Sequence, residues 1–80
     1  MARIRVKLYG ALPKLVQAYD KERGLDLVLP DDAHLKAVLE TLGIPEERRV
    51  VGVLDGRVIK PYDPLPDGVT LTLLESASGG

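Results

Sequence analysis

Hydrophobic and polar residues alternate over several short stretches of this 80-residue chain, which predicts strands with one buried face. In residues 3–9 the even positions are apolar and the odd positions are mostly cationic. The same alternation over Leu25–Leu29 predicts a second strand, which Pro30 ends. A last strand is expected over residues 69–74, with apolar side chains on one face and mainly threonines on the other.

The spacing of apolar residues changes to that of a helix in two places. After Gly10, apolar residues at i, i+3, i+4 and i+7 predict a short helix over residues 12–19, with Pro13 in its first turn. A longer helix is predicted from a second apolar stripe, formed by Leu35, Val38, Leu39 and Leu42. The carboxylates of Asp31 and Asp32 are expected to stabilise its start, and Gly43 is expected to end it.

A hairpin is predicted after the longer helix. Val50–Leu54 is an apolar run, Asp55-Gly56 is a strong turn dipeptide, and Arg57–Ile59 returns. Three prolines in residues 61–68 predict an irregular connection before the last strand. This order of elements predicts one α+β domain, a mixed sheet with the longer helix packed on one face.

Composition narrows the possible functions. The absence of cysteine excludes disulfides and thiolate metal sites, and it fits a reducing, cytoplasmic location. Cations interrupt the apolar residues of the first strand, which argues against a signal peptide, and no run approaches transmembrane length. A net charge of −1 with mixed signs, and the absence of Phe and Trp, argue against a nucleic-acid binder. No membrane or nucleic-acid partner is therefore expected.

No pattern in the body of the chain predicts a self-contained catalytic site. The single histidine, His34, is expected to be a surface or helix-start residue. The adjacent acids at 31–32 and 46–47 are explained by capping or solvation. Ser76 and Ser78 have no base nearby in sequence, and the scattered glycines lack the spacing of a phosphate loop. We therefore expect no cofactor or metal in this chain.

The end of the sequence carries the main candidate chemistry. Residues 75–80 contain no large side chain and are expected to form a flexible tail after a domain of residues 1–74. Gly79 and Gly80 lack a Cβ, so their backbone fits a channel too narrow for other residues. A terminal carboxylate on Gly80 is ionised at neutral pH, and six extended residues reach about 20 Å. The alternative interpretation is a frayed end without function.

The sheet face away from the helix is a candidate docking surface. If the first and last strands are neighbours, Arg3 and Arg5 lie near Thr72 and Leu74, beside the tail. The alternative is that the cations only protect a strand from aggregation and that Leu74 is an ordinary exposed apolar residue.

In the order of its elements the chain resembles the ubiquitin-like β-grasp sulfur carriers, the family of the small subunit of molybdopterin synthase and of the thiamine sulfur carrier. The resemblance covers the whole length and rests on the strand at 4–8, Leu29-Pro30, Leu42-Gly43-Ile44-Pro45, the hairpin at 53–57, Pro66-Asp67-Gly68-Val69 and Ser78-Gly79-Gly80. Residues 10–24 look more like the molybdopterin branch. Residues 73–76 depart from it, since that branch commonly has an aromatic and proline-rich approach to the tail.

The resemblance implies a reaction cycle on Gly80. A ubiquitin-activating-type adenylyltransferase would bind the sheet face, thread Ser78 and Gly79, and adenylate the Gly80 carboxylate with ATP. A sulfur donor, such as a cysteine desulfurase or a rhodanese-like protein, would then displace AMP and leave a thiocarboxylate. The acceptor would be the large subunit of molybdopterin synthase, so this chain would be the sulfur-carrying subunit of a sulfurtransferase. ATP would be used by the activating partner.

Two other functions remain open from the sequence. One is a sulfur carrier for tRNA thiolation or for thiamine or cysteine synthesis, with attachment to lysines as a protein modifier as a further role. The other is a β-grasp interaction module with an inert tail.

Overall fold

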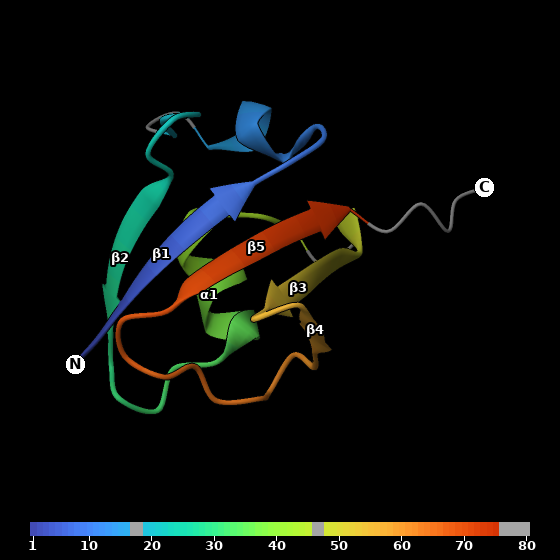
Figure 1. The fold of residues 1–80 in the computed structure, drawn as a ribbon. Coiled ribbons are helices and arrows are strands. Elements are labelled where there is room, and N and C mark those ends of the chain that lie inside the picture. Colours follow the sequence, from blue (N-terminus) through green and yellow to red (C-terminus); the bar gives the residue numbers. More distant parts are fainter. Residues whose placement is uncertain (17–18, 46–47, 76–80) are drawn as a thin grey trace.

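The structure is a computed structural model that describes residues 1–16, 19–45 and 48–75. The described residues form, in chain order, β1 Ala2–Leu8, the 3₁₀ helix η1 Leu12–Leu15, β2 Leu25–Leu29, α1 Leu35–Leu42, β3 Val50–Leu54, β4 Arg57–Ile59 and β5 Thr70–Glu75. The strands form one five-stranded sheet, and α1 lies across one of its faces (Figure 1). The predicted order of elements is confirmed.

The sheet has the strand order β2-β1-β5-β3-β4. The central strands β1 and β5 are parallel, whereas β1 pairs with β2 and β3 pairs with both β4 and β5 in antiparallel fashion. The sheet is therefore mixed, as predicted. The first and last strands are neighbours, which was the condition for the proposed docking face.

The core lies between the sheet and α1. The even residues of β1 point into it, and Ile4 and Val6 are fully buried, as are Leu71 and Leu73 of β5. Gly52 of β3 lies directly under the helix, because a Cβ at this position would come within 3.0 Å of a Leu35 methyl carbon. A larger residue at 52 would force the side chains of Leu35 and Ile59 to shift.

The stretch between β1 and β2 differs from its prediction. Among the described residues of this stretch, only Leu12–Leu15 is helical, as a 3₁₀ turn with Pro13 near its start, and Val16 already has an extended backbone. The helix expected to reach Tyr19 is therefore wrong. A tertiary contact explains the difference, since the Tyr19 hydroxyl accepts a hydrogen bond from the Leu8 amide at 2.8 Å and donates one to the Leu8 carbonyl at 3.3 Å. Tyr19 thus closes the end of β1 instead of extending a helix.

The start of α1 also differs from its prediction. Its N-cap is His34, whose Nδ1 accepts the Ala37 amide at 3.3 Å, and no acidic residue lies in the first turn. The predicted capping by Asp31 and Asp32 is therefore wrong, because both residues precede the cap. Asp31 pairs instead with the amino terminus of Met1, and this hydrogen bond raises the pKa of the terminal amine.

Replacing His34 tests this cap. We expect His34→Ala to lower the free energy of unfolding by about 1 kcal/mol, since it leaves the Ala37 amide without its side-chain acceptor. His34→Asp supplies another acceptor and should retain most of that stability. Urea denaturation of the three proteins measures the difference. Equal losses in both variants would show that the edge contact of His34 with Tyr62, at 5.2 Å between ring centroids, matters more than the cap.

The remaining predictions concern the strands. The hairpin is confirmed, with positive φ at Asp55 and Gly56, as is the end of α1 at a left-handed Gly43. The last strand begins one residue later than predicted and continues through Glu75.

The acid pair at 46–47 and the tail positions 76–80, with the predictions made for them, lie outside the described residues. Among the helices that the structure describes, none is long and apolar enough to cross a membrane.

Candidate functional site: the outer sheet face and the root of the tail

The outer face of the sheet, opposite α1, carries the side chains that alternate with the core residues. Arg5 lies opposite Thr70 and Lys7 opposite Thr72, while Thr72 also lies opposite Val53 of β3. Directly opposed residues of neighbouring strands point to the same face. The outer face is therefore continuous from β1 across β5 to β3.

This face has two chemically different halves. Over β1 and β2 it is charged, with the side chains of Arg3, Arg5, Lys7 and Asp26. Over β3, β4 and the end of β5 apolar side chains lie beside Thr72, and we call this half the valine-leucine patch; it consists of Val51, Val53, Val58 and Leu74. Leu74 is 38% exposed and Val58 is 72% exposed, so the patch is open to a partner.

The four predicted docking residues share the outer face but do not form one cluster. Thr72 and Leu74 lie on the half of β5 that leads to the tail. Arg3 lies near the start of β1, where its carbonyl accepts the Gly68 amide, two residues before the level of Thr70. At about 3.3 Å per residue, Arg3 and Leu74 are separated by about 20 Å along the strands. A partner of ordinary footprint would span both, whereas a small contact would reach only one.

Sequence reasoning missed the three valines of the patch. Val51 lies opposite Leu74, and Val58 lies opposite Val53. The available signal was the uninterrupted apolar character of Val50–Leu54, because a strand with only one buried face normally alternates. An apolar outward face on this strand therefore marks a surface that a partner can cover.

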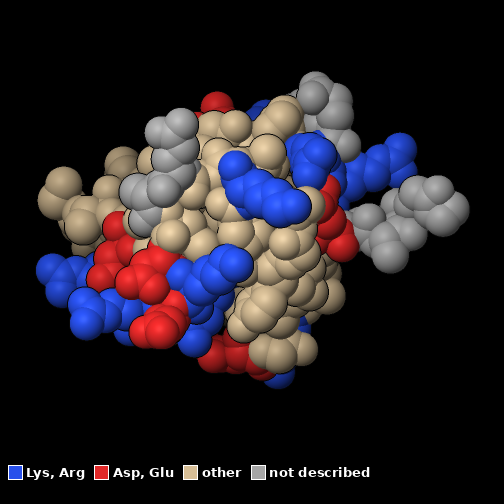
Figure 2. All heavy atoms as spheres, turned by 90° about the horizontal axis from the view of Figure 1, so that it is seen from above, with Lys and Arg blue, Asp and Glu red and all other residues tan. Residues whose placement is uncertain are grey.

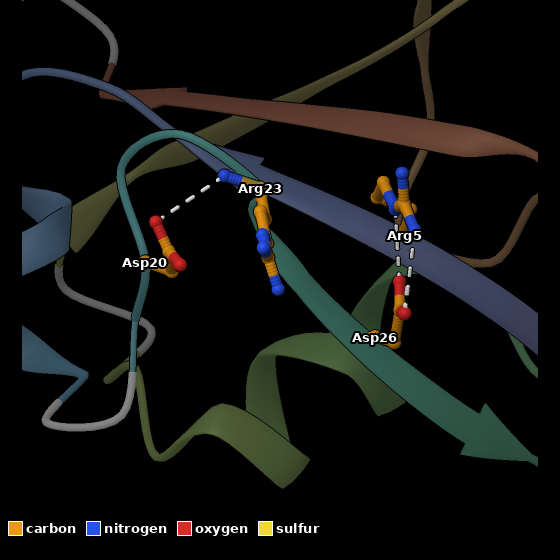
Figure 3. A network of polar contacts seen from close by, with 4 residues as sticks. All are labelled: Arg5, Asp20, Arg23 and Asp26. Atoms are coloured by element: carbon orange, nitrogen blue, oxygen red, sulfur yellow. Dashed lines mark hydrogen bonds and ion pairs between the residues drawn. The ribbon is translucent and has the colours of Figure 1, made fainter.

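Arg5 is engaged in an ion pair on the charged half. Its Nε lies 2.9 Å from Oδ1 of Asp26, across from β1 to β2, and Nη2 lies 3.4 Å from Oδ2 (Figure 3). The hydrogen bond from Arg5 lowers the pKa of the Asp26 carboxyl. The nearby Asp20 has a different task, since its Oδ1 accepts the Arg23 amide and closes the turn before β2. These contacts are structural.

Charges of both signs lie side by side where the molecule is viewed from above (Figure 2). In that view acidic and basic side chains lie together at the left and again at the right, with a broad area of mainly uncharged residues between them. Neither of these two groups consists of charges of one sign only.

The root of the tail lies at the end of β5. Glu75, the last residue of the strand, is in register with Val50, and its Oε2 lies 3.0 Å from Nη2 of Arg48. The end of β1 is close by, because the Tyr9 amide donates to the Leu73 carbonyl at 3.1 Å. Any chain that continues from Glu75 therefore starts at the edge of the valine-leucine patch, beside Leu74.

The described part of the domain brings together no group that resembles a metal site. Over residues 1–16, 19–45 and 48–75, no three His, Cys, Asp or Glu side chains are placed to hold an ion. His34 is used as the cap of α1, as described above. The chemistry predicted for Gly80, with the threading by Ser78 and Gly79, lies outside the described residues and stays a prediction.

Comparison with known proteins identifies relatives by structure and not by sequence. No protein-family model matches the chain, and no curated protein sequence matches it. Among solved structures it is similar to a putative molybdopterin converting factor, subunit 1, from Pyrococcus furiosus, with a TM-score of 0.74 and 15% identity over 96% of this chain and 100% of that one.

Two structures of small archaeal modifier protein 1 from Haloferax volcanii are also similar. One has a TM-score of 0.71 and 16% identity over 99% of this chain, the other a TM-score of 0.73 and 14% identity over 96%, and both are covered completely. At these identities the similarity establishes the fold. The predicted resemblance is thereby confirmed at the level of architecture, and the chain has the ubiquitin-like β-grasp fold.

Proposed function

We propose that this chain is a sulfur carrier for molybdopterin biosynthesis, which works in the cytoplasm. The observation that carries the proposal is the placement of the tail root. A β-grasp domain ends its central strand at Glu75, beside an open apolar patch, and the sequence continues only with small residues to Gly79-Gly80. The similarity to a putative molybdopterin converting factor subunit supports this choice of pathway.

The reaction takes place on the Gly80 carboxylate. One of its oxygens attacks the α-phosphate of ATP in the adenylyltransferase, which releases pyrophosphate and forms an acyl adenylate. Sulfide, or a protein-bound sulfur donor with a reductant, attacks the acyl carbon and displaces AMP, so that one oxygen of Gly80 is replaced by sulfur. The thiocarboxylate then delivers this sulfur to an acceptor bound by the large subunit of a molybdopterin synthase. ATP binds to the activating enzyme and not to this chain.

In this reaction the chain positions the Gly80 carboxylate and supplies no catalytic group. The valine-leucine patch would lie against the adenylyltransferase, and the charged half of the outer face would set its orientation. Five residues beyond Glu75 reach about 17 Å when extended, which is enough to pass from a docked surface into an active site. Fixing the carboxylate against ATP accounts for most of the rate that such a complex gains.

Intact-mass measurement tests the proposal. The chain is incubated with ATP, a ubiquitin-activating-type adenylyltransferase and sulfide, and we expect a species in which sulfur replaces one oxygen. Omission of ATP should leave the mass unchanged. If the complete mixture also leaves it unchanged with an adenylyltransferase that charges its own carrier, and the purified large subunit of a molybdopterin synthase does not bind the chain, the proposal is wrong.

A protein modifier is the second candidate, because two of the similar structures are of a small archaeal modifier protein. In that case the activated Gly80 would be attacked by a lysine amine and form an isopeptide. Peptide mapping separates the two functions, since a modifier leaves a branched peptide on a target lysine and a pure carrier does not.

Leu74→Asp tests the docking surface. We expect the fold to remain intact, because Leu74 points outward, and the specificity constant kcat/KM for adenylation to fall about tenfold, as for a side chain of moderate importance in an interface. Tyr62→Asp is the control, since Tyr62 is exposed and lies against His34 at the start of α1, on the side of the sheet opposite the patch. Equal adenylation kinetics for Leu74→Asp and the unaltered chain would exclude the valine-leucine patch as the docking surface.

A further inference from the structure

The ion pair between Arg48 and Glu75 differs from the others that the structure describes. Its side chains are 35% and 28% exposed, whereas those of Arg5 and Asp26 are 52% and 53% exposed and those at Met1 and Asp31 are almost fully so. Less water surrounds it, so its attraction is screened less. It also lies at the one place where the tail joins the domain.

The end of β5 is paired with fewer strands than the rest of β5. Through Leu73 the strand is paired on both sides, with β1 and with β3, and Leu73 is fully buried. Leu74 and Glu75 lie beyond the last residue of β1 and are paired with β3 alone. Strand ends with a single neighbour open most easily. Glu75 is therefore the residue at which the strand would first detach.

Leu74 and Glu75 point to opposite faces because side chains alternate along a strand. Leu74 belongs to the outer valine-leucine patch, while Glu75 follows the inward Leu71 and Leu73 and meets Arg48 on the side of α1. The ion pair of Glu75 with Arg48 thus keeps the backbone in its strand conformation at the position where Leu74 points outward. One contact on the inner face fixes both the proposed docking residue and the start of the tail.

Arg48 is held in place for this contact. Its amide donates to the Pro45 carbonyl at 3.1 Å, in the connection that leads from α1 into β3. Its Nε is buried, and among the described residues it has no hydrogen-bond partner. A buried unpaired donor is unfavourable for folding. Maximal stability therefore does not explain why the guanidinium lies here.

We propose that Arg48 and Glu75 are a positioning pair, which fixes the point and direction in which the tail leaves the domain. This inference rests on the proposed function. Without the pair, β5 opens back to the buried Leu73, and Leu74 and Glu75 lengthen the connection to the carboxylate by about 7 Å. The Gly80 carboxylate is then found less often in the partner's active site, because a longer connection lowers its effective concentration there.

The test compares Glu75→Gln, Arg48→Gln and the exchanged pair Arg48→Glu/Glu75→Arg in the adenylation assay. For each single variant we expect the KM for the carrier to rise about three- to tenfold with kcat changed less than twofold. The exchanged pair should recover most of the loss. Asp31→Asn is the matched control, because it removes an ion pair at the opposite end of the sheet and should leave KM unchanged.

Hydrogen exchange supplies a second readout that does not need the partner. The Leu74 amide, which faces β3, should exchange faster in both single variants than in the unaltered chain, while the Leu71 amide stays protected. Lower melting temperatures with an unchanged KM would show that the pair is only structural and would overturn the proposal. If the unaltered chain is not adenylated, the proposed function fails, and unchanged exchange at Leu74 would then refute the positioning pair separately.

Discussion

Deletion of Gly80 is expected to reduce thiocarboxylate formation at least about a hundredfold, while the domain folds normally. The shortened chain still ends in a glycine carboxylate, but this group lies about 3.3 Å further from the activating site. A misplacement of about 1 Å at a reacting group is enough to cost about a hundredfold in rate. Intact-mass measurement over time, with ATP, adenylyltransferase and sulfide, determines the rate.

Two companion measurements make this result specific. The thermal midpoint should not change, because the buried core of the described residues is complete by Leu73 of β5. Addition of one glycine after Gly80 should impair the reaction less, since a longer chain can still bring its carboxylate to the activating site. An inert tail predicts that the cellular function survives both changes, and that outcome would support the interaction module instead.

Leu71→Ala is expected to lower the free energy of unfolding by about 2–5 kcal/mol. Leu71 is fully buried in the central strand, opposite Val6 on one side and Leu54 on the other. Its loss leaves a cavity between the sheet and α1 that the neighbouring strands cannot close without breaking their pairing. The free energy of unfolding of a domain of this size is about 5–10 kcal/mol, so the substitution removes a large part of it.

Leu74→Ala provides the matched comparison for stability. It removes the same atoms from the same strand, but Leu74 points outward and is 38% exposed. Its expected cost is below about 1 kcal/mol. Urea denaturation followed by circular dichroism measures both variants. Similar losses at the two positions would contradict the assignment of inner and outer faces on β5.

The position of β5 also suits a protein whose proposed partners bind its C-terminal end. The tail continues from the central part of the sheet and not from the edge strands β2 and β4. A partner that holds the tail therefore pulls on a strand that is paired on both sides through Leu73. Opening that strand would expose the core, so the domain resists unfolding while its terminus is bound.

Local sequence signals were sufficient for most elements. The alternation in β1 and β2, the apolar stripe of α1 and the Asp55-Gly56 turn each lie within a few residues, and each element appears as predicted. Periodicity failed between β1 and β2, where the hydroxyl of Tyr19 binds the backbone of Leu8. The capping prediction failed at the start of α1, since the choice between Asp31 and His34 as the cap depends on the path of the preceding loop.

By itself, the sequence determined that the chain is a mixed α+β domain, and it identified a small-residue end with a candidate carboxylate. Only the tertiary structure brought Val51 and Val58 onto one face with Leu74, and only it joined Arg48 to Glu75. The physical reason is that periodicity reports which side of an element is buried. It contains no information about which distant element becomes the neighbour, because pairing between strands is decided by the packing of the whole sheet.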